Sequence, residues 1–284
     1  MDVSFIIPLY NQVAYTRQIW ADLPLTLPDD LAWEIIFVDD GSSDETQAFL
    51  ASINDPRVTV LRNEPNRGFA GANNRGVEHA QGRFLGLLNN DLILKPGWFE
   101  PILELLAQDG VGGVGNVQYN PATGLIDHAG VYFDLDGLPG HVLKNRRTYP
   151  KGDYAEWNAV TAACFFLSRE LYLELGGFDE AFENGMEDID LCVRIRRHGL
   201  RLLVAHRSVI GHCVSVSRRK STDRERRNTE RFLLRCAETT RPWGQAEWPR
   251  EYLRCHARKW WRLNLFKTLR ALRMIFSEAG KVSQ

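Results

Sequence analysis

Short apolar runs alternate with segments of helical periodicity along the first part of the chain. The runs are rich in β-branched residues and end in polar or turn-forming residues, which is typical of strands buried on both faces of a parallel sheet. The predicted strands are 3–10, 34–40, 58–63 and 83–91. The predicted helices lie around 15–23, 43–53, 69–80 and 97–108. This order predicts an α/β fold, Rossmann-like, with a mostly parallel central sheet flanked by helices.

Polar residues gather where the predicted strands end. In chain order these places are Tyr10 and Asn11, "DDGSSDET" (39–46), "NEPNRGFAGANNRG" (63–76), and Asn89, Asn90 and Asp91. Ligands on open α/β sheets bind at the carboxyl ends of the strands, although Asn, Asp and Gly are also ordinary turn formers. The glycine-rich stretch matches neither a Walker A loop nor a G-x-G-x-x-G fingerprint, which argues against a kinase or a dehydrogenase.

A second group of acidic residues opens the segment "MEDIDLCVRIRRHG" (186–199). Glu187, Asp188 and Asp190 precede a run of alternating apolar and basic residues that ends at a glycine, so the segment predicts an amphipathic helix. Carboxylates in a first turn are favoured by the helix macrodipole. The pattern alone is therefore compatible with a purely structural helix.

The last part of the chain combines helical periodicity with basic and aromatic residues. The segments 229–238 and 250–280 show this periodicity, and the second carries Trp260, Trp261 and Phe266 among lysines and arginines. Such a helix is typical of a membrane interface or of a partner-binding surface. We therefore predict a basic α-helical C-terminal extension.

The charge of the chain is unevenly distributed. Residues 1–200 hold 15 Lys and Arg against 29 Asp and Glu, while residues 201–284 hold 20 against 7, so the parts carry −14 and +13. An acidic body with a basic tail suits a metal site together with an anionic partner, and a tail that docks on the body is the alternative.

Composition narrows the class of protein further. At 284 residues and 44% hydrophobic composition the chain can form one large α/β domain or a domain with an extension. No run of about 18 apolar residues and no secretory signal pattern is present, so we expect a cytoplasmic protein. The five cysteines are widely spaced and form no C-x-x-C pair, which argues against a disulfide framework and a zinc site.

Five motifs, in order, resemble a known family. "FIIPLYN", "FVDDGSSDET", "NRGFAGANNRG" and "LLNND" look like the nucleotide-sugar half of the family-2 inverting glycosyltransferases, which have the GT-A fold, and "GGFDEAFENGMEDIDLCVRIRRHG" (176–199) looks like their acceptor and catalytic-base segment. The resemblance implies a GT-A domain over 1–217, with halves 1–95 and 96–217, followed by the extension 218–284. "LLNND" and "GLIDHAG" are also similar to the bacterial rhamnosyltransferase-like branch, which builds O-antigen and other surface polysaccharides.

The resemblance assigns the nucleotide-sugar contacts residue by residue, and a UDP- or dTDP-sugar is the donor that it implies. The positions that match are Pro8, Tyr10, Asn11, Asp39, Asp40, Arg67, Gly68, Asn73 and Asn90. Arg218 and Arg219, followed by Lys220, are expected either to close over the diphosphate or to remain solvated.

A divalent cation, Mg²⁺ or Mn²⁺, is implied at the end of the fourth strand. The family carries a D-x-D motif there, and in this chain Asn89 replaces its first acid while Asp91 keeps the second. Hard cations prefer one or two carboxylates together with phosphates and waters. His212 is expected either to contact the metal or diphosphate or to be structural.

The implied reaction is an inverting transfer of a sugar to a hydroxyl of a glycan or lipid-linked acceptor. Asp188 is the expected base, and Glu187 is expected to orient the acceptor or to meet a nearby cation. We expect no nucleic-acid partner, and we expect the C-terminal helix to bind an anionic membrane surface, which would make the protein peripheral on the inner face of the cell membrane. A nucleotidyltransferase and a catalytically silent nucleotide-sugar-binding module are the alternatives.

Overall fold

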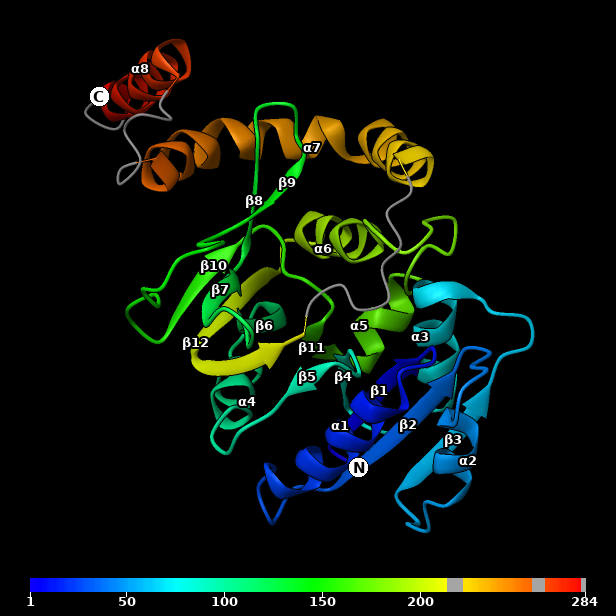
Figure 1. The fold of residues 1–284 in the computed structure, drawn as a ribbon. Coiled ribbons are helices and arrows are strands. Elements are labelled where there is room, and N and C mark those ends of the chain that lie inside the picture. Colours follow the sequence, from blue (N-terminus) through cyan, green and yellow to red (C-terminus); the bar gives the residue numbers. More distant parts are fainter. Residues whose placement is uncertain (214–221, 257–263, 282–284) are drawn as a thin grey trace.

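A computed structural model describes residues 1–213, 222–256 and 264–281 of the chain (Figure 1). The first half contains β1 (Val3–Leu9), α1 (Val13–Leu25), β2 (Trp33–Asp39), α2 (Thr46–Ala51), β3 (Val58–Arg62), α3 (Gly68–His79), β4 (Phe84–Leu88), β5 (Leu92–Ile93) and α4 (Glu100–Leu106). The second half contains β6 (Val111–Asn120), β7 (Leu125–His128), β8 (Val131–Phe133), β9 (Pro139–His141), β10 (Tyr154–Trp157), β11 (Cys164–Ser168), α5 (Arg169–Glu174), α6 (Glu187–Arg197), β12 (Arg201–His212), α7 (Thr222–His256) and α8 (Leu265–Lys281).

The predicted α/β architecture is confirmed. Strands β3, β2, β1 and β4 lie side by side and are all parallel, and the helices predicted between them are present, although α2 is shorter than expected. Side chains of β1 alternate between two apolar cores: Ile6 packs with α3, while Phe5 and Ile7 pack on the side of α1 and α4. Both faces of the strand are therefore buried, which explains its continuous apolar run.

One close contact fixes α3 on the sheet. A Cβ on Gly76 would lie 2.5 Å from Cγ2 of Ile6, so only glycine lets the helix come this near to β1. This spacing sets the position of the loop that enters α3.

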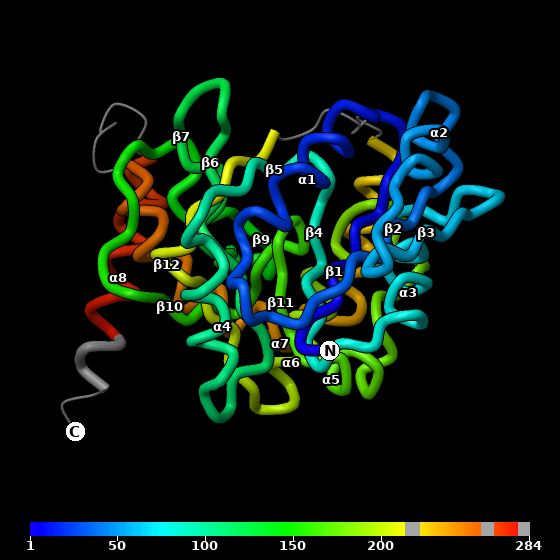
Figure 2. Tube along the Cα trace, turned by 90° about the horizontal axis from the view of Figure 1, so that it is seen from below, coloured from blue at the N-terminus to red at the C-terminus, as the bar shows by residue number. Residues whose placement is uncertain are grey.

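The second half extends the same sheet with mixed strand directions. Strand β11 lies between β4 and β6 and is antiparallel to both, whereas β6 and β12 are parallel. Strands β5, β7 and β10 complete this end of the sheet, and β8 and β9 form a separate hairpin. Figure 2 shows β1, β2 and β3 on one side of the molecule and β6, β7 and β12 on the other. One continuous sheet thus joins the two sequence halves.

Helix α7 packs on the β8–β9 hairpin (Figure 1). The Phe133 ring stacks on Phe232 at 6.5 Å and contacts Trp243 at 5.6 Å between centroids. Glu247 of α7 accepts hydrogen bonds from the backbone N–H of Phe133 and from Asn158 Nδ2, each at 2.7 Å. Burial raises the pKa of Glu247 to about 7. The basic C-terminal region therefore begins with a helix that is docked on the body of the protein.

Helix α8 follows as a separate element. Within the predicted helical segment 250–280 the described residues divide between α7 and α8, and the Tyr252 hydroxyl accepts a hydrogen bond from the Asn264 N–H at 3.0 Å. Trp260 and Trp261 lie outside the described residues. Among the helices that the structure describes, none combines the length and hydropathy needed to cross a membrane.

The α7 packing generates a stability prediction at Gly244. A Cβ at this position would overlap the backbone oxygen of Asp134, whereas Gly→Ala in a helix normally stabilises by about 1 kcal/mol. We expect Gly244→Ala to lower the free energy of unfolding by about 1–3 kcal/mol, as overpacking does. Urea unfolding measures the change, and Gln245→Ala at the exposed neighbouring position is the control. A Gly244→Ala variant as stable as wild type would contradict the packing described here.

Candidate functional site

The end of β2 carries two aspartates whose carboxylates bind groups of the protein itself. Asp39 is buried, accepts a hydrogen bond from the Ser42 N–H at 2.9 Å and forms an ion pair with Arg62. Asp40 accepts from the backbone N–H groups of Arg67 at 2.8 Å and Gly68 at 2.9 Å. Asp40 thus orders the loop into α3, where Gly68 adopts a positive φ of 74°.

The end of β1 is tied to the same loop. Asn11 has a left-handed backbone with φ 57°, and its Oδ1 accepts from the Ser43 N–H at 2.7 Å. The Asn11 N–H donates to Ser42 Oγ at 2.7 Å. The neighbouring Tyr10 is 51% exposed and Pro8 is partly exposed. These two residues therefore offer a surface beside an ordered, polar loop pair.

The remaining expected nucleotide contacts differ in accessibility. Arg67 is half-exposed and pairs with Glu180 at 3.0 Å. Asn90 is partly exposed, and its Nδ2 donates to Thr16 Oγ1 at 3.3 Å. Asn73 is fully buried, and its Nδ2 donates to the Phe69 carbonyl at 2.8 Å. Direct contact of Asn73 with a ligand would require α3 to move, so this residue has a packing position in the structure.

Asp91 and His212 meet at the ends of β4 and β12. Asp91 Oδ1 lies 3.4 Å from His212 Nε2, and both side chains are largely buried. His212 Nδ1 lies 3.0 Å from Gln118 Oε1, an acceptor, so Nδ1 carries the proton in neutral histidine. The lone pair of Nε2 then faces the carboxylate. Asn89 Nδ2 lies 3.5 Å from the same nitrogen.

These residues fit a divalent cation. Asp91 Oδ1 is a buried oxygen without a hydrogen-bond partner in the described structure, and it faces a second acceptor atom, so a cation or a proton would satisfy both. Hydrogen bonding of the far nitrogen is the usual way to orient a histidine ligand. No third His, Cys, Asp or Glu completes a cluster within the described ranges, which leaves coordination positions for phosphate oxygens and waters.

Asp188 lies at the start of α6, next to the segment 161–163 that enters β11. Its Oδ2 accepts from the Ala162 N–H at 3.1 Å, and its Oδ1 accepts from the Ile189 N–H at 2.9 Å. Burial raises the pKa of Asp188, and these hydrogen bonds oppose the shift. The Ala163 carbonyl accepts from the Asn89 N–H at 2.9 Å. One short segment therefore holds Asp188 and the Asp91 strand end close to each other.

The Glu187 side chain is hydrogen-bonded to the loop that precedes α6. It is 5% exposed, and its Oε2 accepts from the Gly185 N–H at 2.5 Å. The preceding loop is strained, with positive φ at Asn184 and Met186. Glu187 orders this loop, whereas Asp188 keeps part of its surface exposed.

One group of predicted site residues is not described by the structure, and one residue of the site was not predicted. Arg218, Arg219 and Lys220 lie outside the described residues. Gln118, which orients His212, was not predicted from the sequence. The available signal was a pair of amides, Asn116 and Gln118, at alternate positions of an otherwise apolar stretch.

The chain matches the family model "Glycosyl transferase family 2" over residues 4–175. It belongs to this family. The O-antigen biosynthesis protein RfbC of Myxococcus xanthus is 31% identical over 76% of this chain and 18% of its own length. The uncharacterized protein y4gI of Sinorhizobium fredii is 33% identical over 69% of this chain and 23% of its own length. The chain thus spans only about a fifth of these relatives.

Solved structures of glycosyltransferases share the fold, which confirms the expected GT-A architecture. GalNAc-T7 with UDP, GalNAc and Mn²⁺ has a TM-score of 0.68 at 21% identity, over 82% of this chain and 48% of that one. The mannosyltransferase PcManGT from Pyrobaculum calidifontis, with GDP-Man and Mn²⁺, has a TM-score of 0.56 at 17% identity, over 99% and 80%.

The arrangement of Asp91, His212 and Gln118 predicts graded losses of Mn²⁺ affinity. We expect Asp91→Asn to weaken Mn²⁺ binding by at least about 100-fold because the charged ligand is lost, and Gln118→Ala by about 10-fold because His212 loses its orientation. Free Mn²⁺ is measured by electron paramagnetic resonance in the presence of UDP. Asp109→Asn, at an exposed carboxylate before β6, is the control. Unchanged affinity in Asp91→Asn would show that the cation does not bind there.

Proposed function

We propose that the protein is an inverting glycosyltransferase that moves a sugar from a nucleotide-diphosphate sugar to a hydroxyl of a glycan or lipid-linked acceptor. The observation that carries the proposal is the position of Asp188, which the 161–163 segment links to the strand end that holds Asp91. A likeness to an O-antigen biosynthesis protein supports a role in bacterial surface polysaccharide synthesis.

The donor would lie along the carboxyl ends of β1, β2 and β4. The nucleoside has the exposed Tyr10 ring and the polar loops after β1 and β2 available to it. UDP and GDP-Man occupy two of the similar solved structures, and a UDP- or dTDP-sugar is our proposed donor. The diphosphate would lie near Asp91 and His212.

Asp91 and His212 would hold a divalent cation, with Asn89 as a neutral neighbour. The cation supplies charge neutralisation of the departing diphosphate. The protein contributes the fixed orientation of His212 through Gln118 and the largely buried position of the Asp91 carboxylate. A preorganised arrangement of this kind needs little rearrangement during the reaction.

Asp188 would act as the base. The acceptor oxygen attacks the anomeric carbon, the bond from that carbon to the phosphate oxygen breaks, and the acceptor proton passes to the Asp188 carboxylate. The diphosphate leaves with the bonding electron pair. A raised pKa makes this carboxylate a stronger base than an exposed aspartate, provided that it remains ionised.

The two alternative functions, a nucleotidyltransferase and a catalytically silent binding module, differ from the proposed function in the products that they release. A nucleotidyltransferase would transfer the nucleotidyl group, whereas this proposal requires release of a nucleoside diphosphate. A catalytically silent binding module would bind the donor without turnover. Thermal shift with a panel of nucleotide-sugars, with and without Mn²⁺, followed by detection of the released nucleotide, distinguishes all three.

The exposed apolar and basic residues of α8 support the proposal that the acceptor is in a membrane. The exposed apolar residues of this helix recur at helical spacing, and they include Leu265 at 68%, Leu269 at 57% and Phe276 at 72% exposed. Lys267, Arg270 and Arg273 lie on the same helix. Basic residues near an anionic surface contribute about 1 kcal/mol each. We propose that α8 attaches the protein peripherally to an anionic membrane surface, on the cytoplasmic side.

The mechanism predicts a defined effect of Asp188→Asn. The amide keeps the size and hydrogen bonding of the side chain but cannot accept the proton, so kcat should fall by about 10²–10⁴-fold while donor binding persists. In the wild type, kcat should rise with pH through the raised pKa of Asp188, at a pH above the usual aspartate range of about 4. Steady-state kinetics between pH 4 and 9 would measure both.

Two further measurements would contradict this assignment. Normal turnover in Asp188→Asn combined with an inactive Glu187→Gln would transfer the role of base to Glu187. Retention of the anomeric configuration, seen by nuclear magnetic resonance of the product, would exclude a single displacement.

The membrane proposal predicts that liposome binding depends on Leu269 of α8 and not on Leu234 of α7. Leu269→Glu should reduce co-sedimentation with anionic liposomes because the apolar face of α8 gains a charge. Leu234→Glu, at a leucine that is 89% exposed on α7, is the matched control. Equal, salt-insensitive sedimentation of wild type and Leu269→Glu would refute membrane binding through α8.

A further inference from the structure

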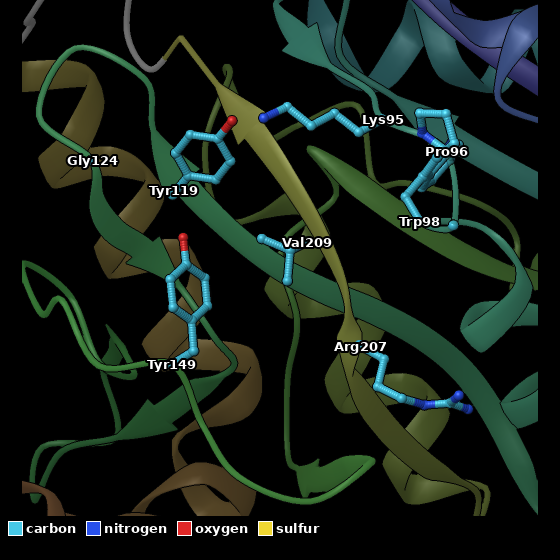
Figure 3. Close-up of a pocket in the computed structure, with 9 residues that line it drawn as sticks. Lys95, Pro96, Trp98, Tyr119, Gly124, Tyr149, Arg207 and Val209 are labelled. Atoms are coloured by element: carbon cyan, nitrogen blue, oxygen red, sulfur yellow. The ribbon is translucent and has the colours of Figure 1, made fainter.

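An open pocket of about 480 Å³ lies at the β6–β12 end of the sheet (Figure 3). Lys95 and Trp98 line it from the segment before α4, Tyr119 from the end of β6, and Arg207 from β12. Tyr149 completes it from the loop between β9 and β10. The residues that bind the donor in the proposed function are not part of this lining.

Lys95 supplies a positive charge to the pocket. The Lys95 ammonium lies 5.9 Å from the centre of the Tyr119 ring and pairs with no carboxylate among the described residues. Arg207, by contrast, is neutralised by ion pairs with Glu104 and with Asp153, the second at 3.3 Å. No aspartate or glutamate lines the pocket, although acidic residues outnumber basic ones nearly two to one over residues 1–200.

Two phenol hydroxyls add neutral donors beside the ammonium. Figure 3 shows the Lys95 ammonium directed toward the hydroxyl end of Tyr119, and the Tyr149 hydroxyl pointing toward Tyr119. Burial raises the pKa of Tyr149, and Lys95 is near enough to oppose that shift, so the phenol stays protonated at neutral pH. Neither hydroxyl donates to a protein group in the described structure. An ammonium and two hydroxyl donors therefore face one space, which suits an anion rich in oxygen acceptors.

The position of the pocket favours the acceptor over the donor as the source of such an anion. In the sheet, β4 separates β1 and β2 from β11, β6 and β12, so the pocket lies on the opposite side of Asp91 from the proposed nucleoside site. Lys95 follows Asp91 after the two-residue strand β5, so a short segment of the chain connects the pocket to the proposed metal site.

The same pocket is linked to the end of α7, after which α8 begins. Arg146 Nη2 donates to the Cys255 carbonyl at 2.8 Å, and the loop that contains Arg146 continues to Tyr149. Figures 1 and 2 both place α8 on the side of β7, β10 and β12, away from β3. A molecule that is anchored where α8 contacts a membrane would approach the reaction from this side.

We propose that this pocket binds the phosphate or diphosphate group of a lipid-linked acceptor, with Lys95, Tyr119 and Tyr149 as its ligands. The inference rests on the proposed function and adds to it the chemical class of the acceptor. The phosphate would fix the position of the acceptor relative to Asp188, so a glycan without it would bind weakly.

The test uses farnesyl diphosphate, a water-soluble isoprenoid diphosphate, titrated calorimetrically into the full chain with EDTA present to keep the metal site from binding it. We expect binding that is at least about tenfold weaker in Lys95→Gln and several-fold weaker in Tyr149→Phe, since hydrogen bonds to a charged group are lost. Lys151→Gln removes the same charge from an exposed position in the Tyr149 loop and should bind like wild type.

Competitors identify the source of the anion. Farnesol should not bind because it lacks the diphosphate. Inorganic pyrophosphate should bind more weakly than farnesyl diphosphate because it has no apolar chain to contact Pro96 and Val209 of the lining. Equal affinity for pyrophosphate would show that the pocket takes free phosphate, and displacement by UDP would assign it to the donor; either result overturns the proposal, as does wild-type affinity in Lys95→Gln. Stabilisation of Lys95→Gln by a nucleotide-sugar with Mn²⁺ is measured in parallel. If that stabilisation is present while farnesyl diphosphate fails to bind, the inference falls and the proposed function stands.

Discussion

The antiparallel insertion of β11 between β4 and β6 is the constraint on which the rest of the site depends. The parallel strands that carry the proposed nucleoside loops end at β4, and β11 joins them to β6 and β12 by hydrogen bonding on both of its edges. The residues just before β11 then bond to the Asn89 backbone on one side and to Asp188 on the other. A proposed metal ligand and a proposed base that are far apart in sequence are thereby brought together through one short backbone segment.

Much of the first half was predictable because each of its elements is specified locally. Strand β1 is apolar on both faces, and the segments between the parallel strands have helical periodicity, so their order defines the fold. Asp91 and Asp188 were also accessible to sequence analysis, since one ends a strand and the other opens a helix. Their positions follow from local pattern and from the family resemblance.

Other features depend on register and packing, which no local pattern determines. His212 faces Asp91 because β12 pairs with β6 through an irregular register between Ala205 and Val209 and because Gln118 is near enough to hold its ring. Helix α7 contains Pro242 and Pro249, residues that normally interrupt a helix, yet it continues across the β8–β9 hairpin. Its docking through Phe232, Trp243 and Glu247 supplies the tertiary contacts that override this local preference.

Protonation of Glu247 is linked to the docking of α7 on the β8–β9 hairpin. The pKa of Glu247 is about 7 when the helix is docked, whereas the free carboxyl of glutamate titrates near 4.5. Between these values the docked state holds a proton that the undocked state releases, so the contribution of this residue to docking is fully present below the lower pKa and is lost as the pH rises through the upper one. Mild acidification therefore tightens the docking of α7 on the β8–β9 hairpin, and alkaline conditions loosen it. The docking of the region that we propose carries the enzyme to the membrane therefore depends on pH through Glu247, a partly buried carboxyl group.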